Sequence, residues 1–137
     1  MYEPKHLIIQ EIVPPVLFDM MTNPKQLFAL FDEQLLIGAD WLRNRYGPMA
    51  CNNWHLGGDF KWSGFRTIGS PHYSPGSMHS VGKALDLKFS KIAAEEIRAD
   101  LRKLEYVPHI TRIEDNVSWL HIDTKRTNSN KLYFFKV

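Results

Sequence analysis

The stretch that decides the fold reads His79-Ser80-Val81-Gly82-Lys83-Ala84-Leu85-Asp86-Leu87-Lys88-Phe89. Its second half, residues 84–89, alternates as a β-strand does, so Asp86 shares a strand face with Ala84 and Lys88. A carboxylate on an otherwise apolar strand is costly to bury unless it is paired or bound to a cation. The stretch therefore predicts a strand that offers a carboxylate to a positively charged group.

A second stretch, Trp119-Leu120-His121-Ile122-Asp123, also has the period of a strand. Positions 119, 121 and 123 then project to one face, while positions 120 and 122 enter the core. If the two stretches converge, His79, Asp86 and His121 supply the two imidazoles and the carboxylate that suit a catalytic zinc ion. The sequence then predicts a metal-dependent hydrolase. The competing interpretation is that both histidines are ordinary surface or hydrogen-bonded residues and that Asp86 is a strand-end carboxylate.

The remaining periodic segments indicate the fold class. Residues 24–46 are predicted to form one amphipathic helix, and a second helix is expected after Ser90 and before Pro108. Residues 7–13 indicate a short strand or an extended arm at an edge. Ser90 is expected to cap the second helix. Further strands are expected near residues 49–52, 109–114, 118–124 and 132–136, with a tight connection at residues 115–117. The predicted fold is α+β, with a small antiparallel sheet backed by two main helices.

Size and composition limit the domain organisation and the partners. The chain has 137 residues and a formal net charge of +2, which does not demand a nucleic acid. We expect a single metallopeptidase domain, with an N-terminal arm at residues 1–23 and a catalytic core at residues 24–137. Cys51 is alone, so no internal disulfide is expected. Neither a signal peptide nor a membrane span is visible, so synthesis in a cytoplasm is expected.

Both stretches resemble the family of zinc-dependent D-alanyl-D-alanine carboxypeptidases and L-alanyl-D-glutamate endopeptidases, whose fold is shared with the Hedgehog signalling domain. The matching segments are residues 77–86 and 119–123, and residues 62–66 are similar to the family's Ser-Gly-Tyr-Arg segment. The resemblance covers roughly residues 24–137. It implies one zinc ion bound by His79, Asp86 and His121, and it implies that Arg66 faces the substrate.

The resemblance also implies a substrate and a setting. The expected activity is hydrolysis of a peptide bond in the peptidoglycan stem, either between L-Ala and D-Glu or between D-Ala and D-Ala. Residues 52–58 look most like small phage-encoded members, so we expect an endolysin-like monomer that reaches the cell wall through lysis-linked release or as a virion component. The alternative is a catalytically weak or inactive zinc-binding virion or wall-binding protein of the same fold.

A general base is needed to take a proton from water and return it to the leaving amine. Many members of the family place an acidic residue a few positions before the late histidine, some as close as three, where this chain has Ser118. We favour Glu114 as the base, with Asp115 and Asp123 as alternatives. Asp115 also suits plain turn chemistry, and Asp123 also suits a supporting role that orients a ligand histidine.

Three further residues are candidates for contact with substrate. Arg66 can form a planar bidentate pair with a carboxylate, although a structural salt bridge is the alternative. Trp119 can form a wall of the cleft, although an aromatic side chain is more often part of the core. His55 lies in a loop near the proposed site, where a solvated histidine is the commoner outcome.

Overall fold

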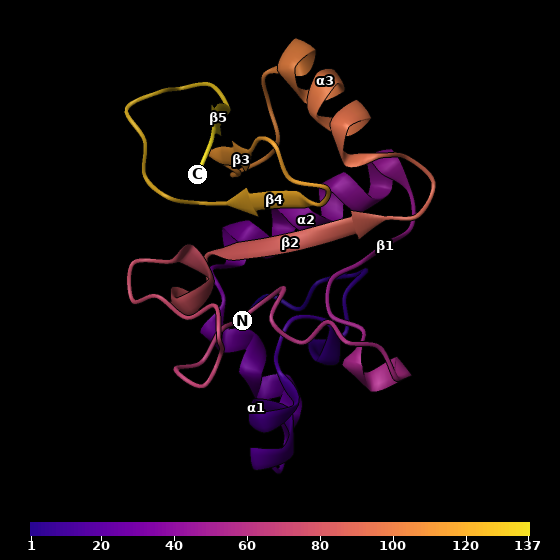
Figure 1. Cartoon of the computed structure of the whole chain (residues 1–137), viewed down its shortest axis with the longest axis vertical. Helices are drawn as coiled ribbons and strands as arrows, with labels where there is room; N and C mark the ends of the chain where they lie inside the picture. Colours follow the sequence, from indigo (N-terminus) through magenta and orange to yellow (C-terminus); the bar gives the residue numbers. More distant parts are fainter.

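A computed structural model of the chain describes all residues, 1–137, and has an α+β architecture (Figure 1). The sheet contains β1 (Met49–Ala50), β2 (Ala84–Phe89), β3 (Arg112–Glu114), β4 (Leu120–Asp123) and β5 (Tyr133–Phe135). The α-helices are α1 (Pro15–Met20), α2 (Glu33–Tyr46) and α3 (Ala94–Leu104). Four 3₁₀ helices connect them: η1 (Ile9–Glu11), η2 (Pro24–Leu30), η3 (Trp54–Leu56) and η4 (Met78–Val81).

The five strands form one sheet in the order β1-β2-β4-β3-β5. The first three neighbouring pairs are antiparallel, but β3 and β5 are parallel, so the prediction of an antiparallel sheet is wrong at this edge. The cause is the loop of residues 124–132, which carries the chain from β4 past β3 to the outer edge. The tight connection predicted at residues 115–117 does join β3 to β4, and Asn116 adopts a φ of 62° there.

The two central strands divide their side chains between two faces. Leu85, Leu87, Leu120 and Ile122 are fully buried in the hydrophobic core. Helix α2 lies behind the sheet in Figure 1 and packs against β2. Burial of each such side chain stabilises the fold by about 1.5–3 kcal/mol. The residues between them, including Asp86 and His121, therefore share the opposite face.

The helix predicted over residues 24–46 is interrupted. The prediction of one continuous helix is wrong, because η2 ends at Leu30 and α2 begins at Glu33. The carboxylate of Asp32 accepts a hydrogen bond from Gln34 N at 3.0 Å and caps α2. Its second oxygen accepts from Thr124 Oγ1 at 2.8 Å, and its backbone N–H donates to the carbonyl of Gly82 at 2.9 Å. The interruption is thus the place where the turn before β2 contacts the helices.

Ser90 does not cap the second main helix, contrary to the prediction. Helix α3 begins at Ala94, and its N-cap is Ala93. The backbone N–H of Ser90 instead donates to the carbonyl of Pro48 at 3.0 Å, and its hydroxyl donates to the same carbonyl at 3.4 Å. Ser90 therefore extends the pairing between β1 and β2.

Residues 7–13 form no strand and do not lie at an edge, so that prediction is wrong. They contain η1, and Leu7, Ile9, Ile12 and Val13 are buried in the same core as the sheet. The carbonyl of Ile12 accepts a hydrogen bond from Phe65 N at 2.8 Å. The N-terminal segment therefore supports the loop that contains Arg66.

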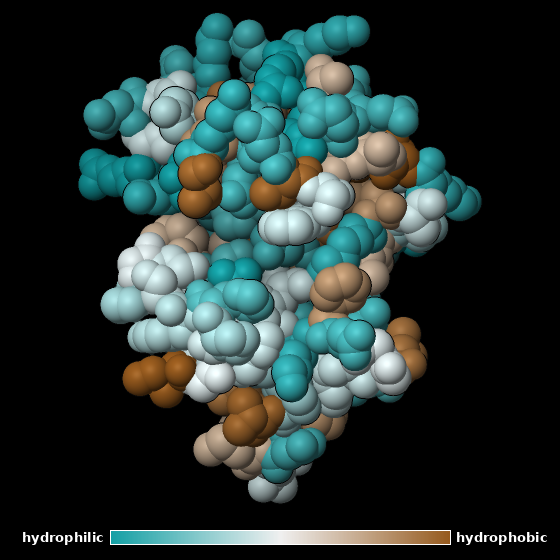
Figure 2. Space-filling view, viewed as in Figure 1, coloured by the Kyte–Doolittle hydropathy of each residue, from teal (hydrophilic) through white to brown (hydrophobic).

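None of the helices is both long and apolar enough to cross a membrane. On the face shown in Figure 2, hydrophobic residues form scattered groups among hydrophilic ones. The upper part of this face, over α3, is mainly hydrophilic.

Replacement of Gly82 is expected to damage the fold next to the site. Gly82 has a φ of +72°, and an added Cβ would overlap the backbone carbonyl of Leu30. Gly57 has a φ of +87° with open space around it, so Gly57→Ala is expected to cost only about 1–2 kcal/mol. Gly82→Ala is expected to cost clearly more. Urea unfolding of both variants measures the difference, and equal midpoints would contradict the contact with Leu30.

Candidate metal centre

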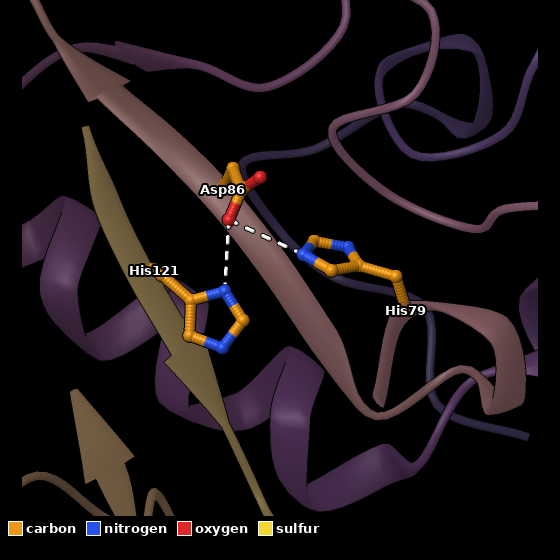
Figure 3. A group of neighbouring side chains, drawn as sticks. All are labelled: His79, Asp86 and His121. Carbon is orange, nitrogen blue, oxygen red and sulfur yellow. Dashed lines mark hydrogen bonds and ion pairs between the residues drawn. The ribbon is translucent and has the colours of Figure 1, made fainter. Parts of the chain in front are cut away.

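Three elements bring His79, Asp86 and His121 together on the open face of the sheet (Figure 3). Asp86 on β2 is directly opposite His121 on β4 in the strand register. His79 lies on η4, whose first turn is capped by Ser77 Oγ accepting from His79 N at 3.2 Å. Their exposed fractions are 3% for His79 and 7% for each of the other two. The centre is therefore buried and polar.

Both imidazoles point at the same carboxylate oxygen. His121 Nδ1 lies 2.9 Å from Asp86 Oδ1, and His79 Nε2 lies 3.3 Å from it. The three potential ligand atoms all lie within 4.8 Å of one another. This group can hold a metal ion.

The partners of the other two ring nitrogens fix which nitrogen faces Asp86 with a lone pair. His79 Nδ1 lies 2.9 Å from the carbonyl oxygen of Gly64, which only accepts hydrogen bonds. His121 Nε2 lies 2.8 Å from Asp123 Oδ2, which is also an acceptor. In the neutral rings, His79 Nε2 and His121 Nδ1 therefore carry lone pairs directed at a carboxylate. Such a set of acceptors is stable only with a proton or a metal cation among them.

Without a metal ion, the proton is held by His121. Burial lowers the pKa of His121, but its hydrogen bonds to Asp123 and Asp86 outweigh burial and raise that pKa to about 9. For Asp86, burial raises the pKa, and its contacts with His121 and His79 more than reverse this, so its pKa lies well below the usual range. A metal ion bound here would take the place of the proton on His121 Nδ1.

Asp123 orients the ring of His121 and is itself held by Arg112. Its side chain is completely buried. The guanidinium of Arg112 donates to both carboxylate oxygens, with Nε–Oδ1 at 2.9 Å and Nη2–Oδ2 at 2.7 Å. The guanidinium also lies 3.8 Å from the centre of the Phe135 ring. The sequence analysis missed Arg112, because only the strand register places it opposite Asp123.

The centre opens into two neighbouring cavities. One has a volume of about 330 Å³ and is lined by all three residues of the cluster together with Glu114. The other has a volume of about 280 Å³ and is lined by Trp62 and His72, among others. Arg66, Asp86 and Trp119 line both cavities. A ligand at the centre can therefore extend to either side of Asp86.

The structure separates the three acidic candidates for a general base. Glu114 lines the 330 Å³ cavity with both histidines. Asp115 lines neither cavity and pairs with Arg102 instead. Asp123 is held by Arg112 and by His121. Of the three, only Glu114 lines the cavity without an ion pair to a neighbouring side chain.

A buried arginine that the sequence analysis also missed holds the β3–β4 turn. Arg98 on α3 is 2% exposed. Its guanidinium donates to the carbonyls of Val117 at 2.7 Å, Trp119 at 3.0 Å and Glu114 at 3.4 Å. Because it bonds the backbone of both Glu114 and Trp119, it fixes the strand ends from which these side chains enter the cavity.

Arg66 is placed at the centre through two hydrogen bonds. Its Nη2 lies 3.4 Å from Asp86 Oδ2, and its Nε donates to the carbonyl of Trp62 at 2.9 Å. The guanidinium thus has donors that are not used by these partners, and Arg66 lines both cavities. Arg66 therefore makes the structural ion pair and can still contact a ligand.

His55 is not brought to the centre, which departs from the expectation that it contacts substrate. It lies on η3 and lines neither cavity. Its ring packs edge-on against Trp54 at a centroid distance of 5.7 Å. Trp54 in turn donates to the carbonyl of Val13 at 2.9 Å, so both residues belong to the packing around the N-terminal segment.

No protein-family model matches the chain, and no curated protein or solved structure matches it.

The raised pKa of His121 predicts a pH-dependent stability of the metal-free protein. The pKa of His121 is about 9 in the folded protein, and its ordinary value is 6.5. The contribution of protonated His121 to the free energy of unfolding is therefore complete below pH 6.5 and is lost as the pH rises through about 9. We expect the free energy of unfolding to fall by about 3 kcal/mol over this window. Urea unfolding in the presence of a chelator measures it. The same fall in His121→Gln would contradict this origin.

Proposed function

We propose that this chain is a zinc-dependent peptidase that hydrolyses a peptide bond in the peptidoglycan stem. The observation that carries the proposal is the convergence of His79 Nε2, His121 Nδ1 and the carboxylate of Asp86 on one buried point. Zinc binds imidazole nitrogen and carboxylate oxygen at about 2.0–2.2 Å, and catalytic zinc sites commonly have three protein ligands. Two histidines and one aspartate suit zinc better than the all-oxygen ligand sets of calcium or magnesium.

The surroundings of the three residues also fit a zinc ion. Each histidine has its second nitrogen bonded to an acceptor, Gly64 O or Asp123, as ligand histidines in zinc sites usually do. The cavity of about 330 Å³ leaves room for water and for a substrate carbonyl beside the ligands. A bound zinc ion would supply a lowered pKa for water and polarisation of the substrate carbonyl.

The residues of the chain would then carry out the remaining steps. Glu114 would accept a proton from the attacking water and return it to the leaving amine. Arg66 would hold a carboxylate or carbonyl oxygen of the substrate through its unused donors. Trp119 would limit access of bulk water on the side where both cavities meet.

The substrate class comes from the resemblance of residues 62–66, 77–86 and 119–123 to the peptidoglycan peptidases. A Hedgehog-like fold, a phage-type endopeptidase and action on the cell wall after lysis or from the virion are parts of this proposal. The bond is either L-Ala-D-Glu or D-Ala-D-Ala. The α+β sheet, with the two ligand strands adjacent, is compatible with it.

One observation favours the alternative of a zinc-binding protein without turnover. Ser118 occupies the position at which an acidic residue is expected, and it is exposed. The position of Glu114 in the cavity supports the enzyme over this alternative, because a carboxylate is available from the neighbouring strand.

Zinc binding is expected to depend on the three clustered residues. Wild-type protein should bind one equivalent of zinc, and His79→Ala, Asp86→Ala or His121→Ala should each weaken binding by more than about 100-fold. Loss of a residue that only orients a ligand already costs about 10–100-fold. Competition with a fluorescent chelator measures the affinity. His72→Ala is the matched control, and it should retain wild-type affinity; unchanged affinity in the cluster variants would refute the ligand set.

The proposed activity is tested with purified peptidoglycan. Wild-type protein should release new amino termini in a zinc-dependent, chelator-sensitive manner, and fragment masses identify the bond. Glu114→Gln is expected to lower the rate about 10²–10⁴-fold with zinc content unchanged. Asp115→Asn serves as the control and should remain close to wild type.

Two outcomes would contradict parts of the proposal. Stoichiometric zinc without any released fragment would reject the peptidase and support the inactive alternative. Wild-type turnover in Glu114→Gln would keep the peptidase but remove Glu114 from the role of base.

A further inference from the structure

The 280 Å³ cavity contains a lysine that the proposed chemistry does not use. Lys88 lies two residues beyond Asp86 on the same face of β2, about 7 Å along the strand. Both residues line this cavity. We name it the Lys88 cavity, and its lining is Asp59, Phe60, Lys61, Trp62, Ser63, Arg66, His72, Asp86, Lys88 and Trp119.

The ammonium group of Lys88 is held in a defined position. Its Nζ donates to the carbonyl of Cys51 at 2.7 Å and to Ser63 Oγ. It also lies 4.1 Å from the centre of the Phe60 ring. A lysine ammonium has three N–H donors, so two are used and one remains for a ligand.

No carboxylate of the protein pairs with this ammonium group. Lys88 takes part in none of the ion pairs of the chain. Asp86 is engaged by Arg66 and by both histidines of the cluster instead. Lys88 is also partly buried. Removing a cation from water costs free energy unless an anion lies next to it. A carboxylate forms a strong charge-assisted hydrogen bond with an ammonium group.

We infer that Lys88 binds a carboxylate of the substrate, on the residue that adjoins the reacting bond. The inference rests on the proposed function, because the reacting bond is placed at the His79–Asp86–His121 cluster. The rise of about 7 Å along the strand between the backbones of Asp86 and Lys88 equals the length of about two extended peptide residues. Because the ammonium is already tethered by Cys51 O and Ser63, little side-chain freedom is lost on binding.

The inference specifies which peptides should bind. Both bonds considered above have a free carboxylate on the residue that retains the amine: the α-carboxylate of D-Glu, or the terminal carboxylate of D-Ala. Conversion of that carboxylate to a carboxamide removes the negative charge and keeps the size. Lys88 should therefore discriminate against the amidated form of either substrate.

The test compares acid and amide peptides by calorimetry. Zinc-loaded protein with Glu114→Gln, which keeps the peptides intact, is titrated with the tripeptide L-Ala-γ-D-Glu-L-Lys and with the same tripeptide bearing an α-carboxamide. A second pair, a D-Ala-D-Ala peptide and its terminal amide, covers the other bond. We expect at least one acid peptide to bind about tenfold or more tightly than its amide, as for a hydrogen bond to a charged group.

Further replacement of Lys88 by Met should reduce this preference to near unity. Lys88→Gln is a second neutral variant that keeps a donor for Cys51 O, and it should give the same result. Lys61→Met, which removes an exposed lysine from the same cavity, is the charge-matched control and should keep most of the preference. Zinc content and the urea midpoint are measured for every variant to establish that it is folded.

The outcomes separate this inference from the proposed function. An equal acid preference with and without Lys88, an equal loss in Lys61→Met, or no binding of any peptide would overturn the inference. Cleavage of peptidoglycan by wild-type protein without a Lys88-dependent preference keeps the peptidase and rejects the subsite. A Lys88-dependent preference without any cleavage keeps the subsite and rejects the peptidase.

Discussion

The approach of two imidazoles to one buried oxygen of Asp86 is the constraint on which the rest of the site depends. Three groups that can all act as acceptors converge there, at 2.9 Å and 3.3 Å between nitrogen and oxygen. The arrangement needs a positive charge, which a proton on His121 or a metal ion can supply. The remainder of the fold keeps the three groups from turning away. The buried point that needs this positive charge is also the candidate site of chemistry.

Distant parts of the chain hold the two histidine rings. Gly64, which accepts from His79, lies in a loop whose backbone contacts the carbonyl of Ile12 in the N-terminal segment. Asp123, which accepts from His121, is held by Arg112 on the next strand. Stability and metal affinity are therefore coupled, because a change in either support alters the direction of a ligand nitrogen. Residues far from the centre in the sequence therefore contribute to its geometry.

Strands β2 and β4, which contain Asp86 and His121, could be predicted from the sequence, because apolar and polar residues alternate along them and this alternation decides which side chains share a face. The alternation along each strand places Asp86 and His121 on the face away from the core, whatever their partners are. The interruption of the long helix at Asp32 could not be predicted, because it depends on contacts with the turn at Gly82 and with Thr124. The direction of β5 and the N-terminal packing likewise depend on long-range contacts, which periodicity does not record. Arg112 and Arg98 were missed for the same reason.

We propose that His79, Asp86 and His121 bind one zinc ion. Anomalous diffraction at the zinc absorption edge, from crystals of the zinc-loaded protein, tests it most directly. A single strong peak is expected about 2.0–2.2 Å from His79 Nε2, from His121 Nδ1 and from a carboxylate oxygen of Asp86. A zinc peak elsewhere on the protein, with the His121–Asp86 hydrogen bond intact, would contradict it.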